Sequence, residues 1–147
     1  MKPQLHLRIV VMGPPSGVAF AMQRGRADLV APVSATSDAL VFEFAVSVAD
    51  ASSDPVRLTG DFAQGPASAR FVYINSGTYA GQNDSAWSRR AKIPLAGITP
   101  KLVQPSLRHE TLKPGGMLEA RIAGVGRDGG PACATVPLLS AWSLVAT

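Results

Sequence analysis

The chain has little of the chemistry that binds metals or forms disulfides. It contains one cysteine, Cys133, and two histidines, His6 and His109, among 147 residues. A single cysteine excludes an intrachain disulfide and a four-cysteine metal site, and two histidines far apart in sequence do not form a spaced zinc motif. The sequence therefore predicts no metal site. Cys133 lies among small residues, which is typical of a buried, unreactive thiol rather than a nucleophile.

Charged residues and long apolar runs are also scarce. Only 16% of the residues are charged, which disfavours both disorder and long helices with charged outer faces. The first apolar run is interrupted by His6 and Arg8, so it does not resemble a signal peptide. The longest uncharged stretch, residues 129–147, is broken by Pro131 and Pro137 and does not read as a membrane span. The expected location is the cytoplasm, with no membrane partner.

Alternation of apolar and polar residues is the dominant pattern. It is clearest over Leu40–Val48 and recurs over Gln4–Met12 and Met117–Ala123. A period of two is the signature of a half-buried β-strand. Further strands are predicted within residues 18–23, 56–62, 70–75, 89–95, 132–138 and 141–145, with an edge strand in residues 24–38 and a helical turn in residues 105–112.

Glycine and proline divide these runs into short segments. There are 14 glycines and 12 prolines, and many strands with turn residues at such spacing are typical of sandwiches and barrels. We therefore expect one all-β domain over residues 1–147. The predicted architecture is an antiparallel sandwich or closed barrel of about eight short strands, with at most one short helix.

Residues 124–129 spell G-x-G-x-x-G, the pattern of dinucleotide-binding loops. In such folds the motif follows a strand and opens a helix. Here Gly130 and Pro131 follow it, and then a strand-like run. Asp128 and Gly129 are instead typical of a tight hairpin turn. We predict no nucleotide and no other cofactor.

Acidic residues give no catalytic pattern. The chain has 10 of them, most in predicted turns, so paired carboxylates for hydrolysis are not indicated. Glu43 and Glu119 lie in the middle of predicted strands. Solvent-facing salt bridges are their expected role.

Basic residues are concentrated in one segment. Between Ser85 and His109 there are five basic residues and no acid, whereas the rest of the chain is nearly neutral. If alternation continues through residues 89–95, Arg89 and Arg90 lie on opposite faces of their strand. One of the two would then either lie at the rim of the core or enter a pocket, where an unpaired guanidinium requires a carboxylate or a bound anion.

Residues 62–95 combine aromatic side chains with polar donors. Aromatic walls with a few fixed polar groups are what a small-ligand pocket needs. The alternative is a β-meander whose aromatic residues fill the core and whose arginines are solvated. The predicted ligand-binding residues are Arg70, Tyr73, Asn75, Tyr79, Gln82, Trp87, Arg89 and Arg90.

The same segment carries a resemblance to a known family. It contains the runs QGP, RFVYI, GTYAGQ and WSRRAKIPL, and the likeness continues through LEARI, GRDGGP, CATV and Trp142. The chain resembles an uncharacterised family of small bacterial proteins, a domain of unknown function. The resemblance implies a bacterial, single-domain protein and supplies no functional residue.

Three functions stay open at this point. The first is a domain that binds a small polar or anionic molecule near residues 70–90. The second is a cofactor-free enzyme that uses acid–base groups in the same pocket, so whether the chain is an enzyme is undecided. The third is a protein-interaction module that forms a homodimer through an exposed strand edge. Nucleic acid is disfavoured as a partner, because a net charge of +4 is modest and aromatic residues make up only 6% of the chain.

Overall fold

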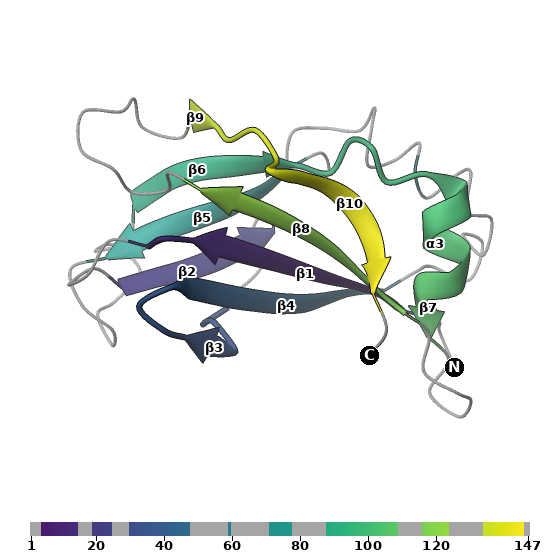
Figure 1. Cartoon of the computed structure of the whole chain (residues 1–147), viewed down its shortest axis with the longest axis horizontal. Helices are drawn as coiled ribbons and strands as arrows, with labels where there is room; N and C mark the ends of the chain where they lie inside the picture. Colours follow the sequence, from purple (N-terminus) through teal and green to yellow (C-terminus); the bar gives the residue numbers. More distant parts are fainter. Residues whose placement is uncertain are drawn as a thin grey trace.

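A computed structural model shows a protein built mainly of β-strands (Figure 1). It describes residues 4–14, 19–24, 30–47, 59, 71–77, 88–108, 116–123 and 134–145. The predictions for Cys133, His109 and the glycine motif at residues 124–129 lie outside the described residues.

The larger sheet is organised around β1 (Gln4–Met12). β4 (Ala39–Ser47) pairs with β1 in antiparallel orientation, and β8 (Met117–Ala123) pairs with its other side in parallel orientation. The sheet continues outward in the order β10-β8-β1-β4-β3, and β7 pairs with the start of β1. These outer strands are β3 (Ser34–Ala35), β7 (Leu107–Arg108) and β10 (Ser140–Val145).

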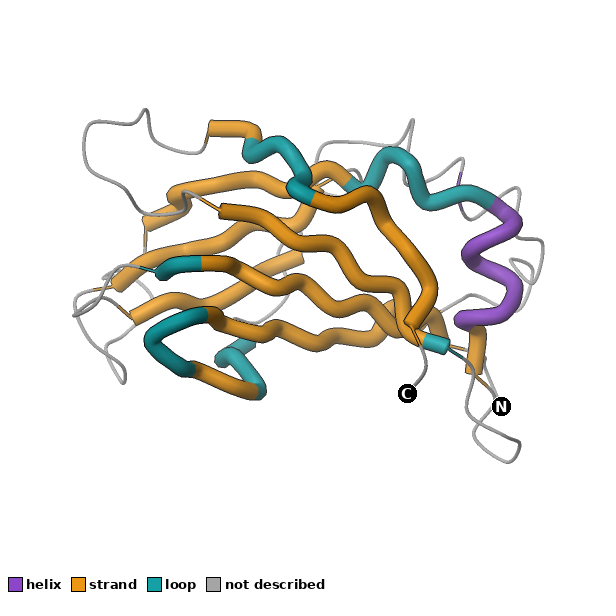
Figure 2. Tube along the Cα trace, in the orientation of Figure 1, coloured by secondary structure: helices purple, strands orange, loops and turns teal. Residues whose placement is uncertain are grey.

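The smaller sheet has the order β2-β5-β6-β9. Its strands are β2 (Ala19–Arg24), β5 (Phe71–Gly77), β6 (Ser88–Pro94) and β9 (Ala134–Thr135). β5 is paired on both sides in antiparallel orientation, and β9 runs parallel to β6. Figure 2 shows that strands make up most of the described chain, with the helix at one end.

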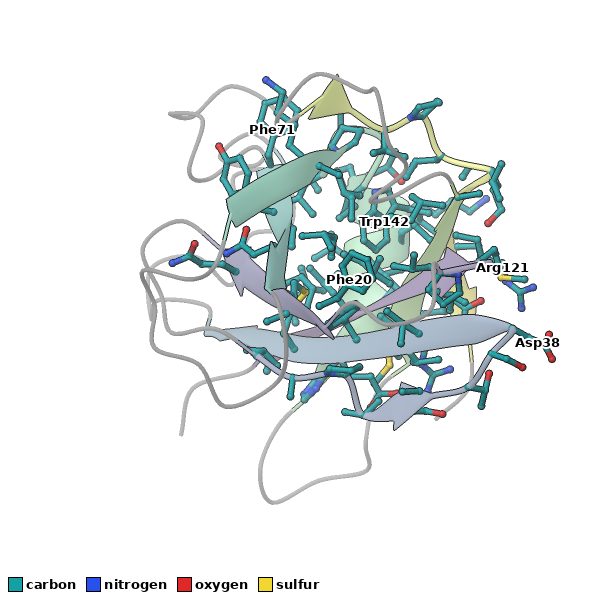
Figure 3. All side chains as sticks on the ribbon, turned by 90° about the vertical axis from the view of Figure 1, so that its left-hand side faces the viewer. Phe20, Asp38, Phe71, Arg121 and Trp142 are labelled. Atoms are coloured by element: carbon teal, nitrogen blue, oxygen red, sulfur yellow. The ribbon has the colours of Figure 1, made fainter. Side chains whose placement is uncertain are left out.

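The core lies between the layers, as the alternation of β1 requires. Leu5, Leu7 and Ile9 are completely buried, whereas the intervening Arg8 is half-buried. Figure 3 shows Phe20 and Trp142 in the space between the sheets. Each fully buried aliphatic side chain contributes about 1.5–3 kcal/mol to the free energy of folding, so apolar burial between the sheets is the main stabilising force.

The helix α3 (Pro100–Ser106) covers one end of the sandwich. Pro100 occupies the first helical position, where its missing N–H is not needed. The carbonyl oxygen of Thr99 accepts hydrogen bonds from the backbone nitrogens of Leu102 and Val103. The Val103 side chain is completely buried in the core.

Two element predictions were wrong, one in position and one in type. The helical turn expected within residues 105–112 is instead the helix Pro100–Ser106, which has Pro105 inside it rather than at its start. Thr59, the one described residue of the strand expected within residues 56–62, is helical. A short apolar run does not distinguish strand from helix by its period alone.

The predicted fold class is confirmed, and the sandwich rather than the barrel is the observed form. The described strands form two separate sheets. Most neighbouring strands are antiparallel, with the β1–β8 and β6–β9 pairs as parallel additions. The edge strand expected within residues 24–38 is β3. None of the described helical residues belongs to a segment long and apolar enough to span a lipid bilayer.

Candidate functional site

β5 buries side chains on both of its faces. Val72 and Ile74 are completely buried in the core between the sheets. Tyr73 and Asn75 alternate with them and therefore lie on the face that points away from the other sheet. They are nonetheless only 7% and 4% exposed. The outward face of a sandwich sheet is normally solvated, so two polar residues buried there mark an unusual site.

Strand register identifies the neighbours of these two residues. Tyr73 lies opposite Gln23 on β2 and Lys92 on β6. Asn75 lies opposite Ala21 on β2 and Arg89 on β6. Residues that face each other across an antiparallel pair share one face of the sheet. We call this surface the outer β5 face, and its described side chains are Ala21, Gln23, Phe71, Tyr73, Asn75, Lys92 and Pro94.

The side-chain amide of Asn75 is only half satisfied. Its Nδ2 donates a hydrogen bond to Oε1 of Gln23 over 3.4 Å. Its Oδ1 is buried and accepts no hydrogen bond. A buried polar atom without a partner costs about 1–3 kcal/mol. Such an atom is uncommon in native proteins and requires an explanation, such as an ordered water, an ion or a functional role.

Lys92 supplies a positive charge at the Phe71 end of the outer β5 face. Its Nζ lies 4.9 Å from the centroid of the Phe71 ring, a cation–π distance. In Figure 3, Phe71 lies away from the space between the sheets that holds Phe20 and Trp142. The ammonium group therefore belongs to the outward surface and not to the core.

The basic pair Arg89 and Arg90 lies at a break in the register. Between Ile74 and Asn75 on β5, the partner on β6 changes from Ala91 to Arg89. β6 therefore carries one extra residue, Arg90, which makes a β-bulge. The prediction that the two arginines lie on opposite faces assumed unbroken alternation, and that assumption is wrong. The structure describes only the backbone of these two residues.

The structure thus brings together part of the predicted site. Tyr73 and Asn75 share the outer β5 face, and the backbone of Arg89 pairs with Asn75. The predicted site residues outside the described part of the chain are Arg70, Tyr79, Gln82 and Trp87.

Gln23, Phe71 and Lys92 were not predicted as site residues. Gln23 lies in a distant segment, and only strand pairing brings it to Tyr73. Phe71 and Lys92 carried a signal in the sequence, because Phe71 alternates with Tyr73 and Asn75, and Lys92 lies within the basic run. Extending the alternation over residues 71–75 would have identified Phe71.

Comparison with known proteins identifies the family of this chain. The sequence matches a family of unknown function, DUF5990, over residues 5–145. The chain belongs to this family. The resemblance seen in the sequence is confirmed to that extent, and the family assigns no activity. No curated protein and no solved structure gives a significant match, so the site must be interpreted from its own geometry.

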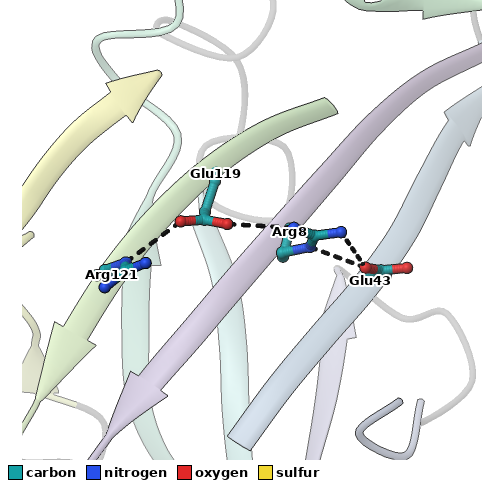
Figure 4. A network of polar contacts seen from close by, with 4 residues as sticks. All are labelled: Arg8, Glu43, Glu119 and Arg121. Atoms are coloured by element: carbon teal, nitrogen blue, oxygen red, sulfur yellow. Dashed lines mark hydrogen bonds and ion pairs between the residues drawn. The ribbon is translucent and has the colours of Figure 1, made fainter. Parts of the chain in front are cut away.

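Charged residues on the other sheet pair with one another. Arg8 lies between Glu43 and Glu119, with Nη2 2.7 Å from Oε2 of Glu43 and Nη1 3.3 Å from Oε2 of Glu119. Arg121 extends the row, with Nε 3.2 Å from Oε1 of Glu119 (Figure 4). The salt-bridging role predicted for the two glutamates is confirmed. Negatively and positively charged side chains alternate across β4, β1 and β8, so these four charged groups pair with one another.

The pKa of Arg8 reflects this arrangement. Partial burial lowers the pKa, but hydrogen bonds and charge attraction from Glu43 and Glu119 outweigh it, and the pKa lies above its ordinary value. Arg8 is therefore a permanent cation. Among the described residues, no three His, Cys, Asp or Glu side chains are grouped so as to hold a metal ion.

Proposed function

We propose that this protein binds a small polar or anionic molecule on the outer β5 face. The observation that carries the proposal is the Asn75 amide, 4% exposed, with an oxygen that accepts no hydrogen bond. A protein gains nothing in stability by burying an acceptor that stays empty. A ligand that occupies this acceptor would remove the cost, which is how buried polar groups in binding sites are used.

The neighbouring groups support a ligand with negative charge. The Lys92 ammonium lies on the same face, and Arg89 pairs with Asn75 along the backbone. No acidic residue occurs between residues 85 and 109. By contrast, the arginines of the other sheet whose side chains are described, Arg8 and Arg121, already contact glutamates. The contrast favours the outer β5 face as the place where an anion binds.

The aromatic residues of this face suit a small molecule. Phe71 and Tyr73 lie two residues apart on β5 and therefore on the same face. Phe71 is half-buried and Tyr73 is buried. They provide a rigid apolar surface beside the polar groups, the usual composition of small-ligand sites. We therefore place the ligand along β5 between the Lys92 ammonium and the Asn75 amide.

A thermal-shift and calorimetric screen tests this proposal. Carboxylates, phosphates and sulfated compounds are added to wild type at low ionic strength, and at least one is expected to raise the melting temperature. Asn75→Leu, which keeps the branched shape of the side chain but removes both polar atoms, should abolish that shift. Lys92→Ala should weaken binding about tenfold, as expected for the loss of one charge-assisted contact.

The matched control is Lys101→Ala. Lys101 is an exposed lysine on α3, a helix that packs against β1, β8 and β10 of the larger sheet, so its removal changes the net charge equally and should leave binding unchanged. If no compound stabilises the wild type, or if Lys92→Ala and Lys101→Ala have equal effects on binding, the proposed function is wrong.

A further inference from the structure

We infer that the ligand of the outer β5 face is a hydroxylated small anion, such as a sugar acid or a sugar phosphate, and that Gln23 sets this requirement by orienting Asn75. The inference rests on the proposed function and adds the chemical class of the ligand. It follows from the direction of one hydrogen bond.

Gln23 determines which atom of the Asn75 amide is left for a ligand. The Asn75 Nδ2 donates to Oε1 of Gln23 at 3.4 Å. An oxygen acceptor at Gln23 holds the amide nitrogen on the β2 side and leaves Oδ1 as the unpartnered atom. Because Gln23 and Tyr73 are paired across the strands, the orienting residue is part of the sheet framework rather than of a ligand-binding loop.

A free carbonyl oxygen selects for hydrogen-bond donors. Ionised carboxylates and doubly ionised phosphates only accept hydrogen bonds, so their oxygens would be repelled by Oδ1 of Asn75. A hydroxyl group donates to it and satisfies it. The anionic group must therefore lie elsewhere on the molecule, toward the Lys92 ammonium beside Phe71. A site of this kind discriminates strongly against analogues that lack the donor, because the buried acceptor then stays unpaired.

Matched probe pairs test the requirement for a donor. Gluconate is compared with hexanoate, and glycerol 3-phosphate with propyl phosphate; within each pair the charged group is kept and the hydroxyls are removed. For at least one pair, calorimetry should show that wild type binds the hydroxylated member about tenfold or more tightly, equivalent to about 1.4 kcal/mol. Asn75→Leu should remove that preference.

Gln23→Met tests the positioning role separately. The variant keeps the length of the side chain but removes the acceptor for Asn75, so the preference for the hydroxylated probe should fall severalfold. A general loss of stability would lower both affinities and leave their ratio unchanged. Gln104→Met, on an exposed position of α3, is the control and should preserve the ratio.

The outcomes separate the two proposals. If hexanoate and propyl phosphate each bind as tightly as their hydroxylated counterparts, the ligand class is wrong while anion binding at this face stands. The same holds if neither probe pair binds but a donor-free anion from the wider screen does. If Gln23→Met keeps the full preference, the positioning role is wrong. If no compound binds at all, both proposals are rejected.

Discussion

The indole nitrogen of Trp142 donates a hydrogen bond to the carbonyl oxygen of Pro94 over 3.0 Å. Trp142 belongs to β10 in the larger sheet and Pro94 ends β6 in the smaller sheet. The bond therefore joins the two layers directly. With only 4% of Trp142 exposed, it also satisfies an indole N–H that would otherwise be buried without a partner.

Trp142→Phe should destabilise the protein by about 1–3 kcal/mol. The variant keeps an aromatic ring between the sheets but removes the donor, so the Pro94 carbonyl loses its partner and the smaller ring leaves a gap. Urea denaturation followed by circular dichroism measures the effect. A change in the free energy of unfolding smaller than about 0.5 kcal/mol would show that the bond between the layers is unimportant.

Arg8→Met should cost more stability than Arg121→Met. Arg8 contacts both glutamates and its side chain is 28% exposed, whereas Arg121 contacts one glutamate and is 53% exposed. Removing Arg8 leaves Glu43 and Glu119 without the cation between them. We expect a loss of about 1–2 kcal/mol for Arg8→Met and at most about 0.5 kcal/mol for Arg121→Met.

Salt and pH provide a check on this difference. Salt of about 1 M should reduce the difference in free energy of unfolding between the two variants, because it screens partly exposed ion pairs. The pKa of Arg8 is raised above its ordinary value in the folded protein, so its contribution is fully present below the ordinary pKa and is lost only as the pH rises through the raised one. Titration of Arg8 should therefore add no pH dependence to stability at neutral or moderately alkaline pH. Equal costs for the two variants would contradict the central position of Arg8.

Gly97→Ala should destabilise the protein through backbone conformation alone. Gly97 has a φ of 96°, and a Cβ added there would meet no atom within 4 Å. The Ile98 nitrogen donates to the Leu95 carbonyl oxygen across this residue, in a turn that needs positive φ at this position. We expect a cost of about 1–2 kcal/mol. Asn at the same position should cost less than Ala, since Asn tolerates positive φ better; the reverse order would contradict the explanation.

Much of the architecture was predictable because alternation is a local property. Both β1 and β8 were predicted with their observed bounds, and β4 within one residue, since each has one face in the core. Pairing between distant strands was not predictable. The parallel pairing of β1 with β8 depends on the path that the long connections take across the sandwich, and no local sequence pattern encodes that path.

The candidate site was likewise predictable only in part. Tyr73 and Asn75 were identified from the composition of their segment, but their burial on the outward face was not. Gln23 reaches Asn75 only through the β2–β5 register. The bulge at Arg90 interrupts the alternation on which the placement of the two arginines depended.

Asn75→Leu should separate stability from binding. Asn75→Leu removes a buried acceptor that has no partner and also the donor to Oε1 of Gln23. Because the first change stabilises and the second destabilises the fold, we expect the free energy of unfolding to change by less than about 1 kcal/mol. Binding of the small anion should be lost in the same variant. A large loss of stability would show that the amide serves the fold rather than a ligand.

The most direct test of the central claim is a two-dimensional NMR titration of the 15N-labelled protein with the anion that gives the largest thermal shift. The Asn75 side-chain amide is assigned by its disappearance in Asn75→Leu. We predict that this signal and the backbone amides of Tyr73, Asn75 and Lys92 shift in a saturable manner, while those of Arg8 and Arg121 on the other sheet do not. Shifts confined to the Arg8 and Arg121 side of the sandwich, or none at saturating anion, would contradict the claim that the outer β5 face is the binding site.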